Sequence, residues 1–290
     1  MSTDYQRVLD SIKDLPPMPV VATKVLKQMQ DPDYSARALA QIIATDSGLS
    51  AQLLRLANSA FFGVPRQIQS LDKAVIMVGE KGLRNMALAA SLKGMNRSFG
   101  LLEKMLWEDS IGSAIGARLI ARTFRTCDPE EAFLGGLFRH IGKIVMDFAE
   151  PEKFQTMIQA AYNGEGSLGD LEGQYFSYSH AVIGAAVLKK WGLSDRLILS
   201  TLHHARADLI EEDDPAVYHL TATVNLAGGL CRRLGIGQRR CLGIGQRRPD
   251  EAFDAAGNPG LNKLQLSVED FDGLGQELET SFAETRELFL

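Results

Sequence analysis

The chain has 290 residues, 45% of them hydrophobic and 23% charged, a balance typical of one globular domain or two modest ones. Its formal net charge of -5 argues against a general binder of nucleic acids or anionic membranes, because both need a positive surface. The N-terminus lacks a secretory leader pattern, no apolar run could span a bilayer, and three scattered cysteines fit reduced thiols, so a cytoplasmic protein without membrane insertion is expected.

Helical periodicity dominates the first third of the chain, and no segment alternates strictly between apolar and polar residues as a strand would. Three prolines in the segment Leu15–Pro19 predict an extended start. Ser35, Ser47 and Ser70 are each predicted to cap a helix. The short helices expected in this bundle span 20–30, 36–44, 48–60, 71–78 and 80–92.

Longer helices are expected after the turn at 94–100, over 101–124, 129–148, 180–191, 194–204, 215–234 and 267–290. Asp128 is a good N-cap and Pro129 suits the first helical position. The apolar residues from Phe133 to Phe148 leave little polar face, which predicts that 129–148 is one continuous, central and buried helix. Asp214 is predicted to begin the helix that Gly235 closes.

The fold class is therefore all-α, with an N-terminal subdomain over 1–96, a second helical subdomain over 97–235, and a loop and C-terminal helix over 236–290. The segment 234–240 is repeated at 242–248, with the sequence LGIGQRR in both copies. We interpret this as a duplication tolerated in a surface loop. Its arginines admit a phosphate or RNA contact, but a solvated loop is the favoured interpretation, because the chain is acidic overall.

All five histidines lie in the second subdomain, at His140, His180, His203, His204 and His219. Histidines and acids that project from several helices can build a metal site, but this distribution alone is weak evidence. His203 and His204 are adjacent, so at most one of them is expected to point inward.

Several segments resemble the HD superfamily of metal-dependent phosphohydrolases. Residues 136–143 are similar to its L-L-H-D-I-G-K helix, with Arg139 and His140 in place of the His-Asp pair. The segments 107–110, 180–184, 191–193, 201–204 and 224–228 resemble further elements of that superfamily. In the N-terminal half, 15–19, 42–50, 54–62 and 68–79 resemble the HDOD branch. The chain is thus identified as similar to HDOD domains over one unit of about 10–235, which implies an N-terminal helical bundle packed on an HD-like bundle.

The departures from the HD pattern concern its metal ligands. Asp109 stands at the first histidine position, Arg139 and His140 at the paired positions, and Gly228 at the last acidic position. The arginine stays charged at any working pH and would repel a cation. We expect Arg139 to pair with Asp109 or a nearby glutamate, or else to contact an anion together with Lys143. No catalytic residue, cofactor or metal is expected, and the candidate ligands for a stray ion are His180, His203 and His204.

Three functions compete. The resemblance implies a non-enzymatic module of bacterial signal transduction, which binds signalling proteins (receiver, kinase or cyclic-di-GMP domains) in trans, or a nucleotide. The alternative is a metal-dependent phosphodiesterase or phosphohydrolase, which the ligand set argues against. A regulator that uses the arginine-rich loop on nucleic acid is disfavoured by the net negative charge.

Overall fold

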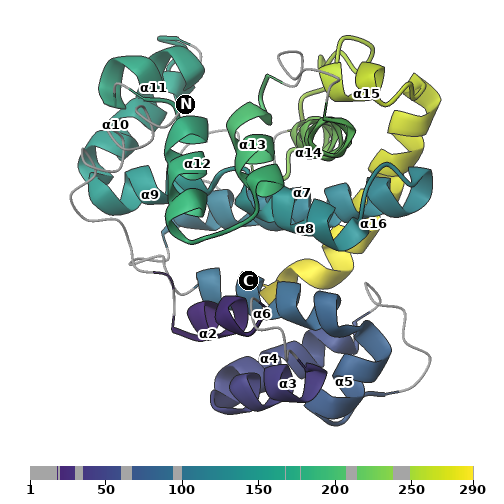
Figure 1. The fold of residues 1–290 in the computed structure, drawn as a ribbon. Coiled ribbons are helices and arrows are strands. Elements are labelled where there is room, and N and C mark those ends of the chain that lie inside the picture. The colour runs from purple at the N-terminus through teal and green to yellow at the C-terminus, as the bar shows by residue number, and fades with distance from the viewer. Residues whose placement is uncertain are drawn as a thin grey trace. The chain divides into compact units, whose positions relative to one another are not determined.

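The computed structural model describes residues 18, 20–29, 35–59, 67–93, 100–166, 168–176, 178–206, 214–237 and 249–289. Within these residues every regular element is a helix, which confirms the all-α fold class (Figure 1). The proline-rich start and both copies of the repeat, apart from residues 234–237, lie outside the described residues. No helix in the described ranges combines the length and the apolar character that crossing a membrane requires.

Contacts between backbones divide the chain into two compact units. The first comprises the described residues of 17–97 together with 279–289. In it α6 packs against α2 and α4, and α3 packs against α5. Its helices, apart from the end of α16, are α2 (Val20–Met29), α3 (Ala36–Ala44), α4 (Ser47–Ala57), α5 (Leu71–Val78) and α6 (Glu80–Lys93).

The second unit comprises the described residues of 98–278, and it holds all five histidines. In it α7 packs against α8 and α14, and α12 packs against α9 and α13. Its helices are α7 (Leu101–Phe124), α8 (Pro129–Phe138), α9 (Ile141–Ala149), α10 (Pro151–Tyr162), α11 (Leu168–Phe176), α12 (His180–Lys190), α13 (Asp195–His203), α14 (Pro215–Leu234), α15 (Pro259–Lys263) and most of α16 (Val268–Phe289).

The helix boundaries follow from local capping chemistry. The side chains of Ser35, Ser70 and Asp128 accept hydrogen bonds from backbone N–H groups of the first turn, as predicted. Asp214 likewise begins α14, and Gly235 closes it with a positive φ. The predicted cap at Ser47 is wrong by one residue, because the carboxylate of Asp46 accepts from Leu49 N instead.

The predicted continuous helix 129–148 is wrong, because the chain turns at Arg139 and His140 and separates α8 from α9. The buried character of the segment is confirmed on both sides of the turn. The break changes the direction in which the two turn residues project. Neighbours on a continuous helix point about 100° apart, whereas here both side chains reach the same carboxylate, that of Asp109.

A half-buried acid on α9 makes the stability of the fold depend on pH. The pKa of Asp147 is raised to about 6, because burial penalises the charged carboxylate and Glu103 on α7 repels it. The folded-state pKa lies above the unfolded one, so the stability from the protonated acid is present below about pH 4 and is lost as the pH rises through about 6.

Asp147→Asn is therefore expected to match the wild type at about pH 4 and to be more stable by about 1–2 kcal/mol at about pH 8, a figure discounted for solvent screening. Urea unfolding at the two pH values measures this difference. A variant that is equally destabilised at both would contradict the assignment.

Candidate functional site

A cavity of about 1190 Å³ opens in the unit that holds the histidines. The sequence-predicted residues Asp109, Arg139, His140 and Lys143 all line it, together with Gly228 of α14. Apolar side chains of α7 and α10 line other parts of the wall, among them Leu106 and Ile158. The cavity therefore joins a charged cluster to an apolar wall, as binding sites for small ligands commonly do.

Arg139 closes one side of this cluster. Its Nη2 donates to both carboxylate oxygens of Asp109, at 2.8 and 3.0 Å, and the arginine residue is only 8% exposed. A Cβ added at Gly228 would lie well inside van der Waals contact of Arg139 Nη1. The predicted ion pair with Asp109 is thus present, and the guanidinium fills the space that a side chain at position 228 would need.

His140 also binds Asp109, from the residue that precedes α9. Its Nδ1 donates to Oδ2 of Asp109, and its Nε2 accepts from Nζ of Lys143 at 3.3 Å. Lys143 is 8% exposed, and its ammonium donates this hydrogen bond to the imidazole of His140. The carboxylate therefore receives two donors, Arg139 and His140, and fixes the orientation of both.

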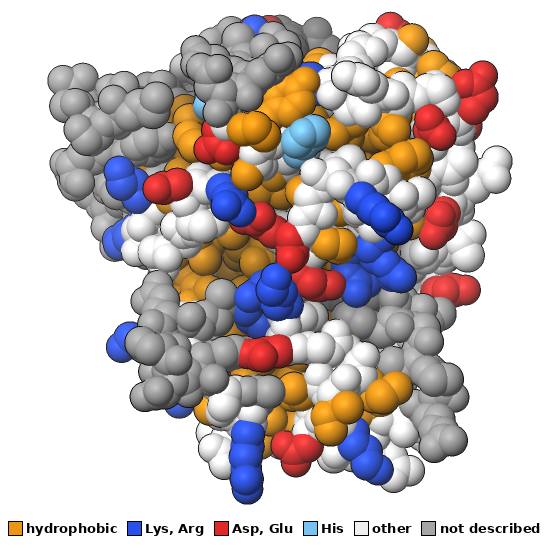
Figure 2. All heavy atoms as spheres, turned by 45° about the vertical axis from the view of Figure 1, so that its right-hand side comes forward, with side chains coloured by type: hydrophobic (Ala, Val, Ile, Leu, Met, Phe, Trp, Pro, Cys, Tyr) orange, Lys and Arg blue, Asp and Glu red, His pale blue; other side chains and the backbone are white. Residues whose placement is uncertain are grey.

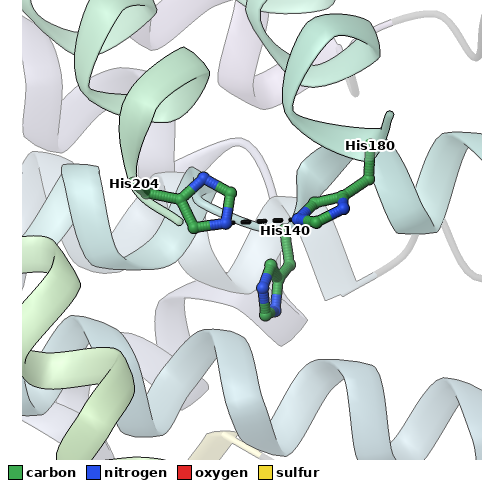
Figure 3. A group of neighbouring side chains, drawn as sticks. All are labelled: His140, His180 and His204. Atoms are coloured by element: carbon green, nitrogen blue, oxygen red, sulfur yellow. Dashed lines mark hydrogen bonds between the residues drawn. The ribbon is translucent and has the colours of Figure 1, made fainter. Parts of the chain in front are cut away.

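His180 and His204 complete a triangle with His140, and the three rings approach from different helix ends (Figure 3). The ring centroids are 5.0, 5.1 and 5.2 Å apart. His180 is held by Glu172, whose carboxylate binds both its backbone N–H and its Nδ1. The Nδ1–H of His204 donates to the carbonyl of Thr201 at 2.7 Å.

The approach of α9 to α12 brings His140 to His180, and it depends on Gly142. A Cβ at Gly142 would overlap the backbone carbonyl of His180. Only glycine allows the two backbones this close. Gly142 therefore allows the triangle of histidines to form, although it has no side chain that could take part in it.

Burial sets the charge state of the cluster. It lowers the pKa of His140, His180 and His204 well below the ordinary value, and the nearby cations Arg139 and Lys143 lower all three further. Burial also lowers the pKa of Lys143, and it raises that of Glu172. The imidazoles are therefore neutral at neutral pH, and each offers a lone pair on one ring nitrogen.

His203 is the one predicted pocket residue that lies outside this cluster. It is the last residue of α13 and is partly exposed, whereas His204 is 3% exposed and faces His180. This confirms that only one member of the doublet points inward. Glu172 was missed, since α11 was not predicted. The spacing of Leu168, Leu171 and Tyr175 is the signal that could have indicated a helix there.

The sequence profile of the HDOD domain matches residues 15–207. The chain belongs to the HDOD family. A curated relative from Treponema pallidum (strain Nichols), described as an uncharacterized protein, is 28% identical over 216 residues. The match covers 72% of this chain but only 41% of that relative, so the HDOD chain spans about two fifths of the relative's length.

Solved structures share the fold. A crystal structure of an HDOD domain protein of unknown function from Geobacter sulfurreducens has a TM-score of 0.79 and 23% identity, and the match covers 99% of this chain and 96% of that one. A second structure, from Shewanella amazonensis SB2B and provisionally described as a phosphohydrolase, has a TM-score of 0.74 and 22% identity, with 98% of each chain covered. At these identities the likeness supports the HD-like helical fold alone.

Proposed function

We propose that this HDOD chain is a non-enzymatic bacterial signalling module that acts by binding a partner. The partners that the family resemblance suggests are signalling proteins, such as receiver, kinase or cyclic-di-GMP domains, supplied in trans. A second mode of binding uses the cavity that Lys143 and Arg139 line: a nucleotide binds there, and its phosphate contacts these two side chains.

The observation that carries this proposal is the position of Arg139. A hydrolytic centre that uses manganese, iron or magnesium needs carboxylates to offset the charge of the ions. Here both oxygens of Asp109 bind Arg139, and the guanidinium fills the space beside Gly228. His140 stands where the resemblance expects an acid. The site has thus exchanged anionic ligands for a fixed cation.

The alternative function is a metal-dependent phosphodiesterase, and one observation favours it. Three histidines converge beside a cavity large enough for a nucleotide. A metal ion held by Asp109 would lie about 4 Å from the guanidinium, however, and would be repelled by several kcal/mol even at an effective dielectric near 20. Regulation through nucleic acid is less favoured, because the formal net charge is -5. On the face drawn in Figure 2, described acidic and basic side chains intermix.

The test is hydrolysis of a generic phosphodiester and of cyclic dinucleotides by the full chain with added manganese, iron or magnesium. We expect no turnover above a buffer control. Turnover that follows the protein through repurification and disappears in His180→Ala, but persists in His203→Ala, would overturn the proposal. Stoichiometric nucleotide binding without turnover would favour the nucleotide mode over a protein partner.

A further inference from the structure

Each histidine of the triangle has one ring nitrogen bound to an oxygen. Nδ1 of His140 binds Asp109, Nδ1 of His180 binds Glu172, and Nδ1 of His204 binds the carbonyl of Thr201. Proteins hold metal-binding histidines in this way, since the outer hydrogen bond fixes the tautomer and the ring orientation. Nε2 of His180 and Nε2 of His204 then face each other, whereas Nε2 of His140 accepts from Nζ of Lys143.

The distance between two of these nitrogens matches the spacing of ligands on a small tetrahedral ion. Nε2 of His180 and Nε2 of His204 are 3.2 Å apart, and one ligand atom from each of the three histidines lies within 4.8 Å of the others. Imidazole nitrogens bound to tetrahedral zinc at 2.0–2.1 Å are about 3.3 Å apart. Two imidazole lone pairs that face each other at this distance repel unless a positive charge lies between them.

A proton is the competing explanation for the His180–His204 contact. The carbonyl of Thr201 can only accept, so His204 carries its hydrogen on Nδ1 and must accept on Nε2. His180 can donate to it either as an imidazolium paired with the Glu172 carboxylate, or as a neutral ring whose Nδ1 accepts from a protonated Glu172. A shared proton accounts for the contact of two histidines, whereas an ion would also use His140, whose ring centroid lies 5.0 and 5.2 Å from theirs.

We propose that His140, His180 and His204 form a mononuclear site for a borderline divalent cation, with zinc as the ion that fits. The site differs from the ligand set that the HD resemblance implies, because it contains no carboxylate ligand and excludes the residues at positions 109, 139 and 228. It revises the expectation of no bound metal and replaces His203 with His140 as a ligand.

The role of the ion rests on the proposed function: it is bound without hydrolysis and joins three parts of the fold. His140 precedes α9, His180 begins α12, and His204 follows α13. An ion bound only to the folded chain stabilises it in proportion to its concentration. Zinc would therefore tighten the packing around the cavity, and the binding of a partner at the cavity would depend on zinc.

Lys143 competes with the ion. Its ammonium donates to Nε2 of His140 at 3.3 Å, the nitrogen that the metal needs. Zinc binding must displace this group into the cavity that Lys143 lines. Lys143→Met, which keeps much of the apolar stem and removes the charge, is therefore expected to bind zinc about 10-fold or more tightly than the wild type.

The experiment titrates untagged, chelator-treated full chain with zinc chloride, by calorimetry and by competition with a chromophoric chelator. We expect one zinc per chain. Since an outer-shell partner alone contributes about 10–100-fold in affinity, Glu172→Gln is expected to weaken binding about 10-fold and His180→Ala or His204→Ala roughly 100-fold or more. The matched control His203→Ala, one residue from a ligand, is expected to stay within about 2-fold of the wild type. Cobalt in place of zinc should give the visible absorption of a tetrahedral ion.

Wild-type protein that binds no stoichiometric zinc, or His203→Ala that loses zinc as His204→Ala does, would overturn the site. Circular dichroism identifies variants that do not fold, and for those the gain of affinity in Lys143→Met decides, because an unchanged affinity there contradicts the proposal. Failure here leaves the non-enzymatic function standing. Zinc binding accompanied by phosphodiester turnover would keep the site and overturn that function.

Discussion

Gly228→Ala is expected to lower the melting temperature by about 6–12 °C, although alanine is normally the better helix residue by about 1 kcal/mol. The added Cβ would overlap Nη1 of Arg139, and because this residue is only 8% exposed, we expect its guanidinium to make room by moving off Asp109. Breaking a buried ion pair costs about 3 kcal/mol or more, and each kcal/mol corresponds to about 2–4 °C for a protein of this size.

The control is Gly273→Ala on α16, where an added Cβ meets no atom within 4 Å and the melting temperature is expected to stay or rise slightly. Arg139→Ala removes the group that collides, so the double variant Arg139→Ala/Gly228→Ala is expected to be no less stable than Arg139→Ala alone. Additive losses in calorimetric melts would show that the two positions do not share this space.

Gly142→Ala is expected to have an effect of similar size, for a different reason. Its Cβ would overlap the backbone carbonyl of His180, and a backbone atom cannot rotate away as a side chain does. We expect a loss of about 3 kcal/mol or more and the separation of α9 from α12. Gly173→Ala on α11, where nothing lies within 4 Å, is the control.

Because the triangle depends on this contact, Gly142→Ala is also expected to weaken zinc binding while Gly173→Ala is not. Thermal melts with and without zinc chloride measure both effects in one experiment. A Gly142→Ala protein with the melting temperature and zinc response of the wild type would show that the close contact of α9 and α12 is dispensable.

Local chemistry made most helix ends predictable. The Ser35, Ser70 and Asp128 side chains act within three residues of their own position, so their effect is visible without a fold. The turn at Arg139 and His140 was not predictable in this way. The apolar run on either side keeps helical spacing and contains no proline, and the turn is supported by contacts with Asp109, 30 residues earlier in the chain.

The structure brings six of the seven predicted pocket residues together, but His203 lies outside the cluster and Glu172 was not predicted. Asp109, Arg139, His140, Lys143, His180 and His204 come together, and the pairing of Arg139 with Asp109 is present as expected. The use of Gly228 as space for a guanidinium, and of Glu172 as the support of His180, depends on tertiary packing. Gly228 leaves room for the guanidinium of Arg139, and the sequence alone does not show that this space is used.

We propose that the guanidinium of Arg139 takes the place of the acids of an HD-type metal centre. Anomalous diffraction at the zinc edge, from crystals grown with zinc chloride, tests it most directly. We expect a single zinc peak about 2.0–2.1 Å from the Nε2 atoms of His140, His180 and His204, with Arg139 still bound to both oxygens of Asp109. A second metal peak, or Asp109 bound to metal with Arg139 turned away, would contradict it.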